Sequence, residues 1–264
     1  MKRAAVFFVT LAVCVSMTAQ SVRSQWNGRT IAYLGDSITD ADQLGRTNDT
    51  YWNIMVDMMG IKPLVYGING HQMSQVKGQA EKLLEEQGQS FDAIMVFAGT
   101  NDFNSSVPIG RWFDTDTREV SRNGEMKTLL HRTHSFDSDT FCGRINTVLS
   151  YLKHEFPTKQ IILVTPVHRA YAKFGEDNEQ PDESYANEAG EFIDAYVECI
   201  KQAGNIWSVP VIDLNADCGL YPLDQAYSVY FRDSGKDMLH PNTDGHRRMA
   251  LALSCRLLGI PVIE

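Results

Sequence analysis

A serine and a histidine at opposite ends of the chain have the side chains needed for nucleophilic chemistry. Ser37 lies in GDSITD, directly after the apolar run Thr30–Leu34, and His240 lies in DMLHPN. A serine hydroxyl becomes reactive when a base removes its proton, and histidine has the pKa suited to that work. Asp237 precedes His240 by three residues, a spacing that places both on one side of a helical turn and lets the carboxylate orient the imidazole. Each segment alone has a plainer interpretation, Ser37 as a helix N-cap and DMLHPN as a surface loop.

Two further strand ends bring glycine and amide groups to the same edge of the expected sheet. GTND (99–102) follows the apolar run Ala93–Ala98, and GING (67–70) follows Pro63–Tyr66. N–H donors placed where negative charge develops stabilise a tetrahedral intermediate, and each contributes about 10²–10³ in rate. Turn formation is the plainer interpretation of both segments, because Gly, Asn and Asp are the usual turn residues.

Taken together, the four segments resemble the SGNH (GDSL) hydrolase superfamily of esterases and acylhydrolases. The motif blocks of that superfamily occur in order as GDSITD, YGINGH, GTND and DMLHPN, between residues 35 and 242. The resemblance implies a flavodoxin-like sandwich with five parallel strands in the order 2-1-3-4-5. An asparagine often opens the second block, where this chain has Val65.

The resemblance also implies a role for each site residue. Ser37 is the expected nucleophile, His240 the general base, and Asp237 the residue that orients His240. The N–H groups of Ser37 and Gly70 and the side-chain amide of Asn101 form the expected oxyanion hole.

The pattern of apolar residues independently predicts an α/β fold. Five near-continuous apolar runs are typical of strands covered on both faces, and helical spacing occurs between them. The expected strands are Thr30–Leu34, Pro63–Tyr66, Ala93–Ala98, Gln160–Thr165 and Val209–Leu214; the expected helices are Tyr51–Met59, Gln72–Gln87, Thr140–Phe156, Glu183–Ala203 and Asn242–Leu257. This alternation implies a three-layer α/β/α sandwich, with residues 20–264 as a single domain.

Three of the connections that leave strands are long: Phe103–Asp139, Val167–Asp182 and Asn215–Lys236. Ligands bind at the carboxyl ends of strands in such sheets, so these connections are expected to surround Ser37. They contain many aromatic and arginine side chains, which suit sugar rings: Phe103, Trp112, Phe113, Phe136, Tyr171, Phe174, Tyr221, Tyr227, Arg111, Arg132, Arg169 and Arg232. The residues assigned to substrate binding are Asp36, His71, Trp112 and Phe113.

Composition excludes some classes of function. The formal net charge of −9 over 264 residues, with no basic stripe, argues against nucleic acid as a partner. His71, His168 and His246 are alternative bases, but none has an aspartate three residues before it. His131 and His134 with Asp137 and Asp139 match no common zinc spacing, so neither a metal nor a cofactor is expected.

The cysteines leave two interpretations open. Beyond the N-terminal segment the chain has Cys142, Cys199, Cys218 and Cys255, without a C-x-x-C pair. In an oxidising compartment they allow one or two disulfides of unspecified pairing; buried small apolar side chains are the alternative.

The first residues have the pattern of an export signal. Lys2 and Arg3 precede an apolar stretch from Ala4 to Val15, and Ala19 ends a cleavage site, so residues 1–19 are interpreted as a signal peptide. Lipid attachment at Cys14 is the rival interpretation. No later stretch is long and apolar enough for a membrane span, which takes about 20 residues.

These observations lead to one functional hypothesis with two alternatives. We expect a secreted or periplasmic serine esterase that removes short acyl groups, acetyl in the first instance, from a small molecule or polysaccharide through an acyl-enzyme. A lipase or lysophospholipase-type acylhydrolase, and a carbohydrate-binding relative without catalysis, are the alternatives. The sequence does not specify the oligomeric state.

Overall fold

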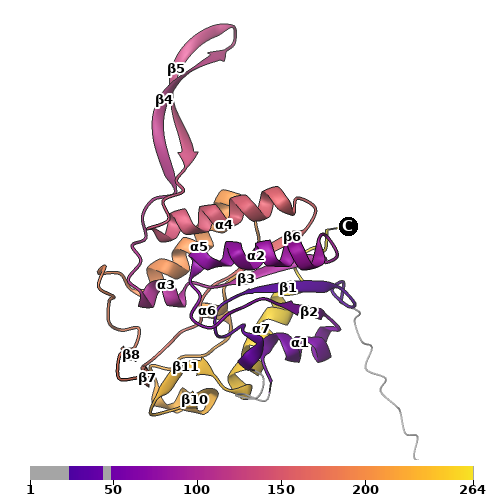
Figure 1. The fold of residues 1–264 in the computed structure, drawn as a ribbon, viewed down its shortest axis with the longest axis vertical. Helices are drawn as coiled ribbons and strands as arrows, with labels where there is room; N and C mark the ends of the chain where they lie inside the picture. Colours follow the sequence, from indigo (N-terminus) through magenta and orange to yellow (C-terminus); the bar gives the residue numbers. More distant parts are fainter. Residues whose placement is uncertain (1–23, 44–48, 264) are drawn as a thin grey trace, which may run out of the picture.

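Five parallel strands form the central sheet of the protein (Figure 1). The computed structural model describes residues 24–43 and 49–263. The strands are β1 (Thr30–Gly35), β2 (Lys62–Val65), β3 (Ala93–Phe97), β6 (Gln160–Val164) and β9 (Val211–Ile212), in the order β2-β1-β3-β6-β9. Numbered along the sheet-forming strands alone, this is the predicted order 2-1-3-4-5, which is therefore confirmed.

Helices cover both faces of this sheet, and the strand residues alternate between them (Figure 1). The helices are α1 (Tyr51–Met59) and α7 (Thr243–Leu257) on one face, and α2 (Met73–Gln87), α4 (Phe141–Glu155) and α5 (Ile193–Trp207) on the other. In β1, Ala32 and Leu34 pack in the core under α2 and α4, whereas Ile31 and Tyr33 pack in the core over α1 and α7. The inner strands β1, β3 and β6 are thus buried on both sides, which explains their near-continuous hydrophobicity, whereas the edge strand β2 is only partly buried.

Helix α5 differs from its prediction at both ends. The sequence predicted Glu183–Ala203 with Gly204 as C-cap, but the helix begins at Ile193 and ends at Trp207. Before it, the Asn187 side chain accepts hydrogen bonds from the N–H groups of Ala189 and Glu191, a local arrangement that competes with helix formation. Gly204 lies inside the helix instead, and a side chain larger than glycine is excluded there because a Cβ would overlap Val211 of the neighbouring strand.

The connections at the carboxyl edge of the sheet contain structure that the sequence reasoning did not predict. Short elements are η1 (Ala41–Gln43), α3 (Thr100–Asn104), α6 (Leu214–Asp217) and η2 (Gln225–Tyr230). A second sheet has the order β10-β11-β7-β8, formed by β7 (Ala172–Gly175), β8 (Asn178–Gln180), β10 (Phe231–Asp233) and β11 (Asp237–Pro241). Strand β11, which carries most of the DMLHPN motif, thus pairs with one strand from each of two predicted long loops, β10 and β7.

The third connection forms a long hairpin that stands away from α4 (Figure 1). Its strands are β4 (Phe113–Arg122) and β5 (Glu125–His134), paired without interruption. Asn123 and Gly124 join them and both have positive φ, 56° and 83°, as a two-residue type I′ turn requires. The Asn-Gly pair is a sequence signal for a hairpin, and it was the signal by which this element could have been predicted.

The predicted export signal at residues 1–19, including Cys14, lies outside the described residues. In the part of the chain that the structure describes, no helix is long and apolar enough to cross a membrane.

Candidate active site

Ser37 lies on a tight turn directly after β1, with its hydroxyl facing His240. The turn is closed by hydrogen bonds from the N–H groups of Thr39 and Asp40 to the Asp36 carbonyl. Glycine is required at position 35, because a Cβ there would overlap the Phe97 carbonyl of β3. The Ser37 Oγ lies 2.9 Å from His240 Nε2, within hydrogen-bond distance, although the two residues are 203 positions apart.

Asp237 contacts the other nitrogen of the same imidazole. Both carboxylate oxygens of Asp237 lie 3.0 Å from His240 Nδ1, and Oδ1 also accepts the backbone N–H groups of Leu239 and His240. The predicted helical turn is wrong, because both residues belong to strand β11. The pairing of β10 with β11 is irregular here, and Asp237 also accepts the two backbone hydrogen bonds just described. Together these features bring the Asp237 carboxylate to the His240 imidazole, although the two residues are three positions apart on a strand.

The environment of Asp237 favours its charged form. Burial alone would raise the pKa of this carboxyl, but the hydrogen bonds from His240 and the charge of that imidazole outweigh burial and hold the pKa below its usual value. Asp237 is therefore an ionised acceptor for the Nδ1 proton, which leaves Nε2 unprotonated and able to accept a proton from Ser37.

Three N–H donors predicted for an oxyanion hole lie on the neighbouring loops. Gly70 has φ of 78°, a left-handed conformation that glycine adopts readily, and its Cα has open space beside it. Asn101 donates one side-chain N–H to the His71 carbonyl, 3.0 Å away. Among the described residues, the second N–H of that amide and the backbone N–H groups of Gly70 and Ser37 have no acceptor. All three donors are thus available to a ligand oxygen.

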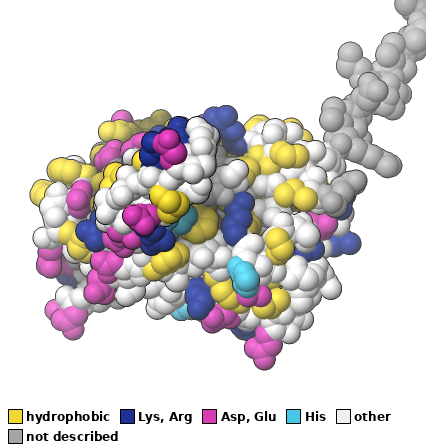
Figure 2. All heavy atoms as spheres, turned by 90° about the horizontal axis from the view of Figure 1, so that it is seen from above, with side chains coloured by type: hydrophobic (Ala, Val, Ile, Leu, Met, Phe, Trp, Pro, Cys, Tyr) yellow, Lys and Arg dark blue, Asp and Glu magenta, His cyan; other side chains and the backbone are white. Residues whose placement is uncertain are grey.

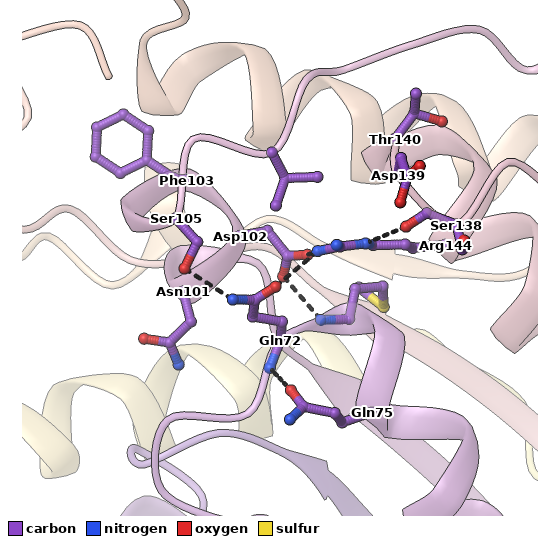
Figure 3. Close-up of polar contacts among 12 residues, drawn as sticks. Gln72, Gln75, Asn101, Asp102, Phe103, Ser105, Ser138, Asp139, Thr140 and Arg144 are labelled. Carbon is purple, nitrogen blue, oxygen red and sulfur yellow. Dashed lines mark hydrogen bonds and ion pairs between the residues drawn. The ribbon is translucent and has the colours of Figure 1, made fainter. Parts of the chain in front are cut away.

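A buried ion pair positions the segment that carries Asn101. Asp102 accepts the N–H of Met73 at the start of α2 and pairs with Arg144 of α4, at 2.7 and 2.8 Å (Figure 3). Burial raises the pKa of the Asp102 carboxyl despite these partners. Figure 3 shows that the Asn101 side chain points away from this network. Asp102 therefore joins α3, α2 and α4, as a structural residue.

Gln79 was not predicted, yet it joins the end of β1 to the segment that follows β2. Its Oε1 accepts the Gly35 N–H and its Nε2 donates to the Gly35 carbonyl, both at 2.8 Å. The same Nε2 lies 2.9 Å from His71 Nδ1, which must be the acceptor because the amide nitrogen is a donor. His71 is therefore held with its remaining proton on Nε2, and burial lowers the pKa of this imidazole. Only tertiary structure brings these groups together, since glutamine on a helix has no distinctive sequence signal.

Asp36 is closed off from any ligand, so its assignment to substrate binding is corrected. Its side chain is buried, and Oδ1 accepts the N–H of Ile38 at 3.0 Å. Burial raises the pKa of Asp36 to about 7, with the charge of Asp102 adding to the effect. The residue stabilises the turn beneath Ser37 instead.

Trp112 and Phe113 also require correction, because they contact the helices at the base of the hairpin. The Trp112 indole donates to Gln202 of α5 at 2.9 Å, and the Trp112 carbonyl accepts from Asn146 of α4. Phe113 packs against Arg132 and forms a hollow with the end of α5. Helix α5 ends immediately before β9, so its last turns lie toward the amino edge of the sheet, opposite the edge that carries Ser37.

Phe174 is a loop aromatic that reaches His240. Its ring centroid lies 5.3 Å from that of His240 in an edge-to-face arrangement, and 43% of its surface is exposed. Arg169, by contrast, is almost completely buried and donates to Gln180 at 2.6 Å, so this loop arginine is structural. A cavity of about 470 Å³ opens beside His71, lined by groups of mixed polarity that include Tyr66, Ile68, Gln75 and Lys82.

The other histidines have structural neighbours. His168 bonds Glu183 at 2.5 Å, and burial lowers the pKa of His246 to about 3. His131 bonds Asp116, and His134 stacks on Trp207. Within residues 24–43 and 49–263, no group of three or more His, Cys, Asp or Glu side chains could hold a metal ion.

The cysteines are thiols in this structure, and two of them face each other. The Sγ atoms of Cys142 in α4 and Cys199 in α5 lie 3.2 Å apart in the core. Cys218 is buried and Cys255 is exposed.

Charges on the upper face of the molecule are mixed. Figure 2 shows Lys and Arg interspersed with Asp and Glu there, without a continuous basic patch on that face. This distribution differs from the basic footprint of a nucleic-acid-binding surface.

Comparison with known proteins identifies the family. Residues 33–248 match the GDSL-like lipase/acylhydrolase family, a range that includes Ser37, Asn101, Asp237 and His240. The chain belongs to this family. GDSL-like acylhydrolases are carboxylic ester hydrolases, so the protein is an enzyme of that class with an ester as substrate. No curated protein matches the chain.

Solved structures of GDSL-like and related proteins share the fold. A protein from Lactobacillus plantarum is 23% identical, with a TM-score of 0.68 over 89% of this chain and 98% of the other. A possible lipase from Chitinophaga pinensis is 20% identical, with a TM-score of 0.63 over 88% and 100%. A catalytic mutant of Axe2, an acetylxylan esterase from Geobacillus stearothermophilus, is 19% identical, with a TM-score of 0.53 over 90% and 97%.

Proposed function

We propose that this GDSL-family esterase hydrolyses short acyl esters through a Ser37–His240–Asp237 triad. The observation that carries the proposal is the unbroken relay, with Ser37 Oγ 2.9 Å from Nε2 of His240 and Asp237 3.0 Å from Nδ1. A nucleophile, a base and a residue that orients the base, each within hydrogen-bond reach of the next, are the arrangement of a covalent hydrolase.

The proposed reaction has two halves. The Ser37 oxygen attacks the ester carbonyl as His240 Nε2 takes the hydroxyl proton of Ser37. The resulting oxyanion accepts hydrogen bonds from the N–H groups of Ser37, Gly70 and Asn101. His240 returns the proton to the leaving alkoxide, which departs as the alcohol and leaves an acyl-enzyme. Water then attacks this second ester, again losing a proton to His240, and the carboxylic acid and free Ser37 are released.

We propose acetylated carbohydrate as the substrate class. The cavity beside His71 contains the polar side chains of Ser74, Gln75 and Lys82, which offer hydrogen-bond partners for sugar hydroxyls. The exposed Phe174 ring next to His240 adds an apolar face on which a sugar could rest. The acetylxylan esterase among the structural neighbours supports the same class.

Replacement of the nucleophile tests the mechanism. Ser37→Ala should abolish hydrolysis of p-nitrophenyl acetate and prevent labelling by a fluorophosphonate. Ser254→Ala is the matched control, because Ser254 is also buried and its hydroxyl has no partner among the described residues. Turnover that survives in Ser37→Ala, while the control behaves as wild type, would remove Ser37 from the mechanism.

A comparison of esters tests the substrate class. Acetate release from acetylated xylan should exceed the hydrolysis of acyl chains of eight or more carbons at equal ester concentration. The opposite preference would favour a lipase-type acylhydrolase. Binding of xylan without acetate release or fluorophosphonate labelling would favour a carbohydrate-binding relative.

The export signal predicted at residues 1–19 leads us to propose that the enzyme acts outside the cytoplasm. Cell fractionation tests this location, and full-length protein in the cytoplasmic fraction would contradict it.

A further inference from the structure

The β4–β5 hairpin is an unusually exposed element for a folded chain. All but a few of its residues are exposed, and it stands away from the rest of the molecule in Figure 1. A two-stranded hairpin alone in water is marginally stable, because it buries almost no apolar surface. A partner that covers one face would supply the missing burial.

The pairing register separates the hairpin into two faces with different chemistry. Residues directly opposite each other, and every second residue along each strand, share a face. One face carries most of the charges, and several of them are paired within the hairpin: Arg118 and His131 both contact Asp116, and Lys127 contacts Glu125. It also carries Val120 and Leu129, whose exposed fractions of 46% and 40% are smaller than those of the two most exposed apolar residues on the other face.

The opposite face, here named the Leu130 face, has strongly exposed apolar side chains and two charged side chains without an ion-pair partner among the described residues. It consists of Phe113, Thr115, Thr117, Glu119, Ser121, Met126, Thr128, Leu130, Arg132 and His134. Leu130 is 76% exposed and Met126 is 64% exposed. Glu119 and Arg132 form no ion pair with any described residue, and Arg132 lies over the Phe113 ring, 4.1 Å from its centroid.

The Leu130 face is complementary to a second copy of itself. If two hairpins pack face to face in opposite directions, centred on the Thr117–Leu130 pair, Leu130 meets the same residue of the other copy. Glu119 of each copy then lies level with Arg132 of the other, because these residues are two positions on either side of the centre. Packing in the same direction would instead put Arg132 level with Arg132.

The same arrangement gives the exposed Met126 a place to bind. Met126 lies four positions from the centre, level with Phe113 and His134 of the second copy. These two residues, with Arg132, Asn205 and Ile206, line a hollow of about 360 Å³ at the base of the hairpin. The end of α5 forms one wall of it, so the tip of one hairpin would contact the body of the other molecule.

We propose that the protein forms a two-fold symmetric dimer through the Leu130 faces of two antiparallel hairpins. Each ribbon is about 33 Å long at about 3.3 Å per residue, so the contact lies at the low end of specific interfaces. We therefore expect a weak dimer that dissociates on dilution. This inference does not depend on the substrate or on the triad.

Sedimentation velocity over a dilution series tests the dimer. Wild-type protein should change from dimer to monomer on dilution, and Leu130→Asp should weaken the dimer by at least about 30-fold, because it places two carboxylates at the centre of the contact. Leu129→Asp is the matched control, since Leu129 is 40% exposed on the charged face and should leave the dissociation constant within about threefold.

A charge exchange provides a second test. Glu119→Arg and Arg132→Glu should each weaken the dimer, and the double variant should recover most of the loss if the two residues meet across the contact. Circular dichroism and ester hydrolysis confirm that each variant is folded. The proposal is overturned if wild-type protein stays monomeric up to about 500 µM, a range that covers weak specific contacts, if Leu129→Asp disrupts the dimer as strongly as Leu130→Asp, or if the double charge variant recovers nothing.

Discussion

Asp237→Asn removes the negative charge of the third residue of the proposed triad but keeps the size and shape of its side chain. Asparagine has the same size and keeps one oxygen for the backbone N–H groups of Leu239 and His240, so the local backbone of β11 should persist. What is lost is a carboxylate whose oxygens both lie 3.0 Å from His240 Nδ1. An asparagine N–H in that place would favour the tautomer with the proton on Nε2, which cannot accept a proton from Ser37.

The size of the effect follows from the distance. A positive imidazolium about 4 Å from the carboxylate charge is stabilised by roughly 4 kcal/mol at an effective dielectric constant of about 20. Each ~1.4 kcal/mol is tenfold in rate, so kcat should fall by roughly 10³-fold. KM should change little, because Asp237 lies behind the imidazole and away from the substrate.

The assay is the steady-state release of p-nitrophenol from p-nitrophenyl acetate, with fluorophosphonate labelling of Ser37 as a second rate. Asp233→Asn is the matched control, because Asp233 is exposed on the adjacent strand and accepts a similar local hydrogen bond from Gly235. It should retain wild-type kcat. A fall of less than about tenfold in folded Asp237→Asn would refute the role assigned to the carboxylate.

Three further predictions concern groups around the site and in the core. Burial raises the pKa of Asp36 to about 7 in the folded state, against 3.8 ordinarily, so its ionisation should lower the stability of the fold as pH rises through that interval and by a constant amount above it. Asp36→Asn should therefore remove a destabilisation of up to about 4 kcal/mol at pH 8 and little below pH 4. Thermal unfolding of both proteins at the two pH values measures the difference. An equal stability change at both pH values would contradict the assignment. Gln79→Leu keeps the volume of the side chain but removes its hydrogen bonds to Gly35 and His71. We therefore expect roughly 2–4 kcal/mol of destabilisation in urea unfolding and a lower kcat. Unchanged stability would show that the amide does not hold these segments together. Cys142 and Cys199 should lose two protons and two electrons to oxidised glutathione and form a disulfide, which mass spectrometry detects as a loss of about 2 Da. Cys142→Ser should prevent this loss. If both thiols stay free after prolonged oxidation, this pairing is ruled out.

Much of the fold was predictable because burial on both sides of a strand leaves a direct trace in the sequence. The apolar runs around Ile31, Ile94 and Ile161 each alternate between two cores, which is why the strands of the central sheet could be predicted from their hydrophobicity. Their order was predicted from the resemblance to the SGNH superfamily, and the structure agrees with it. Helix ends were less predictable. At α5, the side chain of Asn187 and the close approach of Gly204 to Val211 decide the limits, and both depend on contacts distant in sequence.

The sequence alone predicted which side chains would carry the chemistry, because a serine, a histidine and an aspartate with their motif blocks are recognisable without coordinates. Only tertiary structure decided how they meet. His240 reaches Ser37 across 203 positions through strand β11, which pairs with another loop, and Gln79 joins Gly35 to His71 from a helix. Tertiary structure also placed Trp112 and Phe113 at the hairpin base and Phe174 at His240. The physical reason is that motifs reflect local chemical requirements, whereas the loops over a site are positioned by long-range packing that no local pattern records.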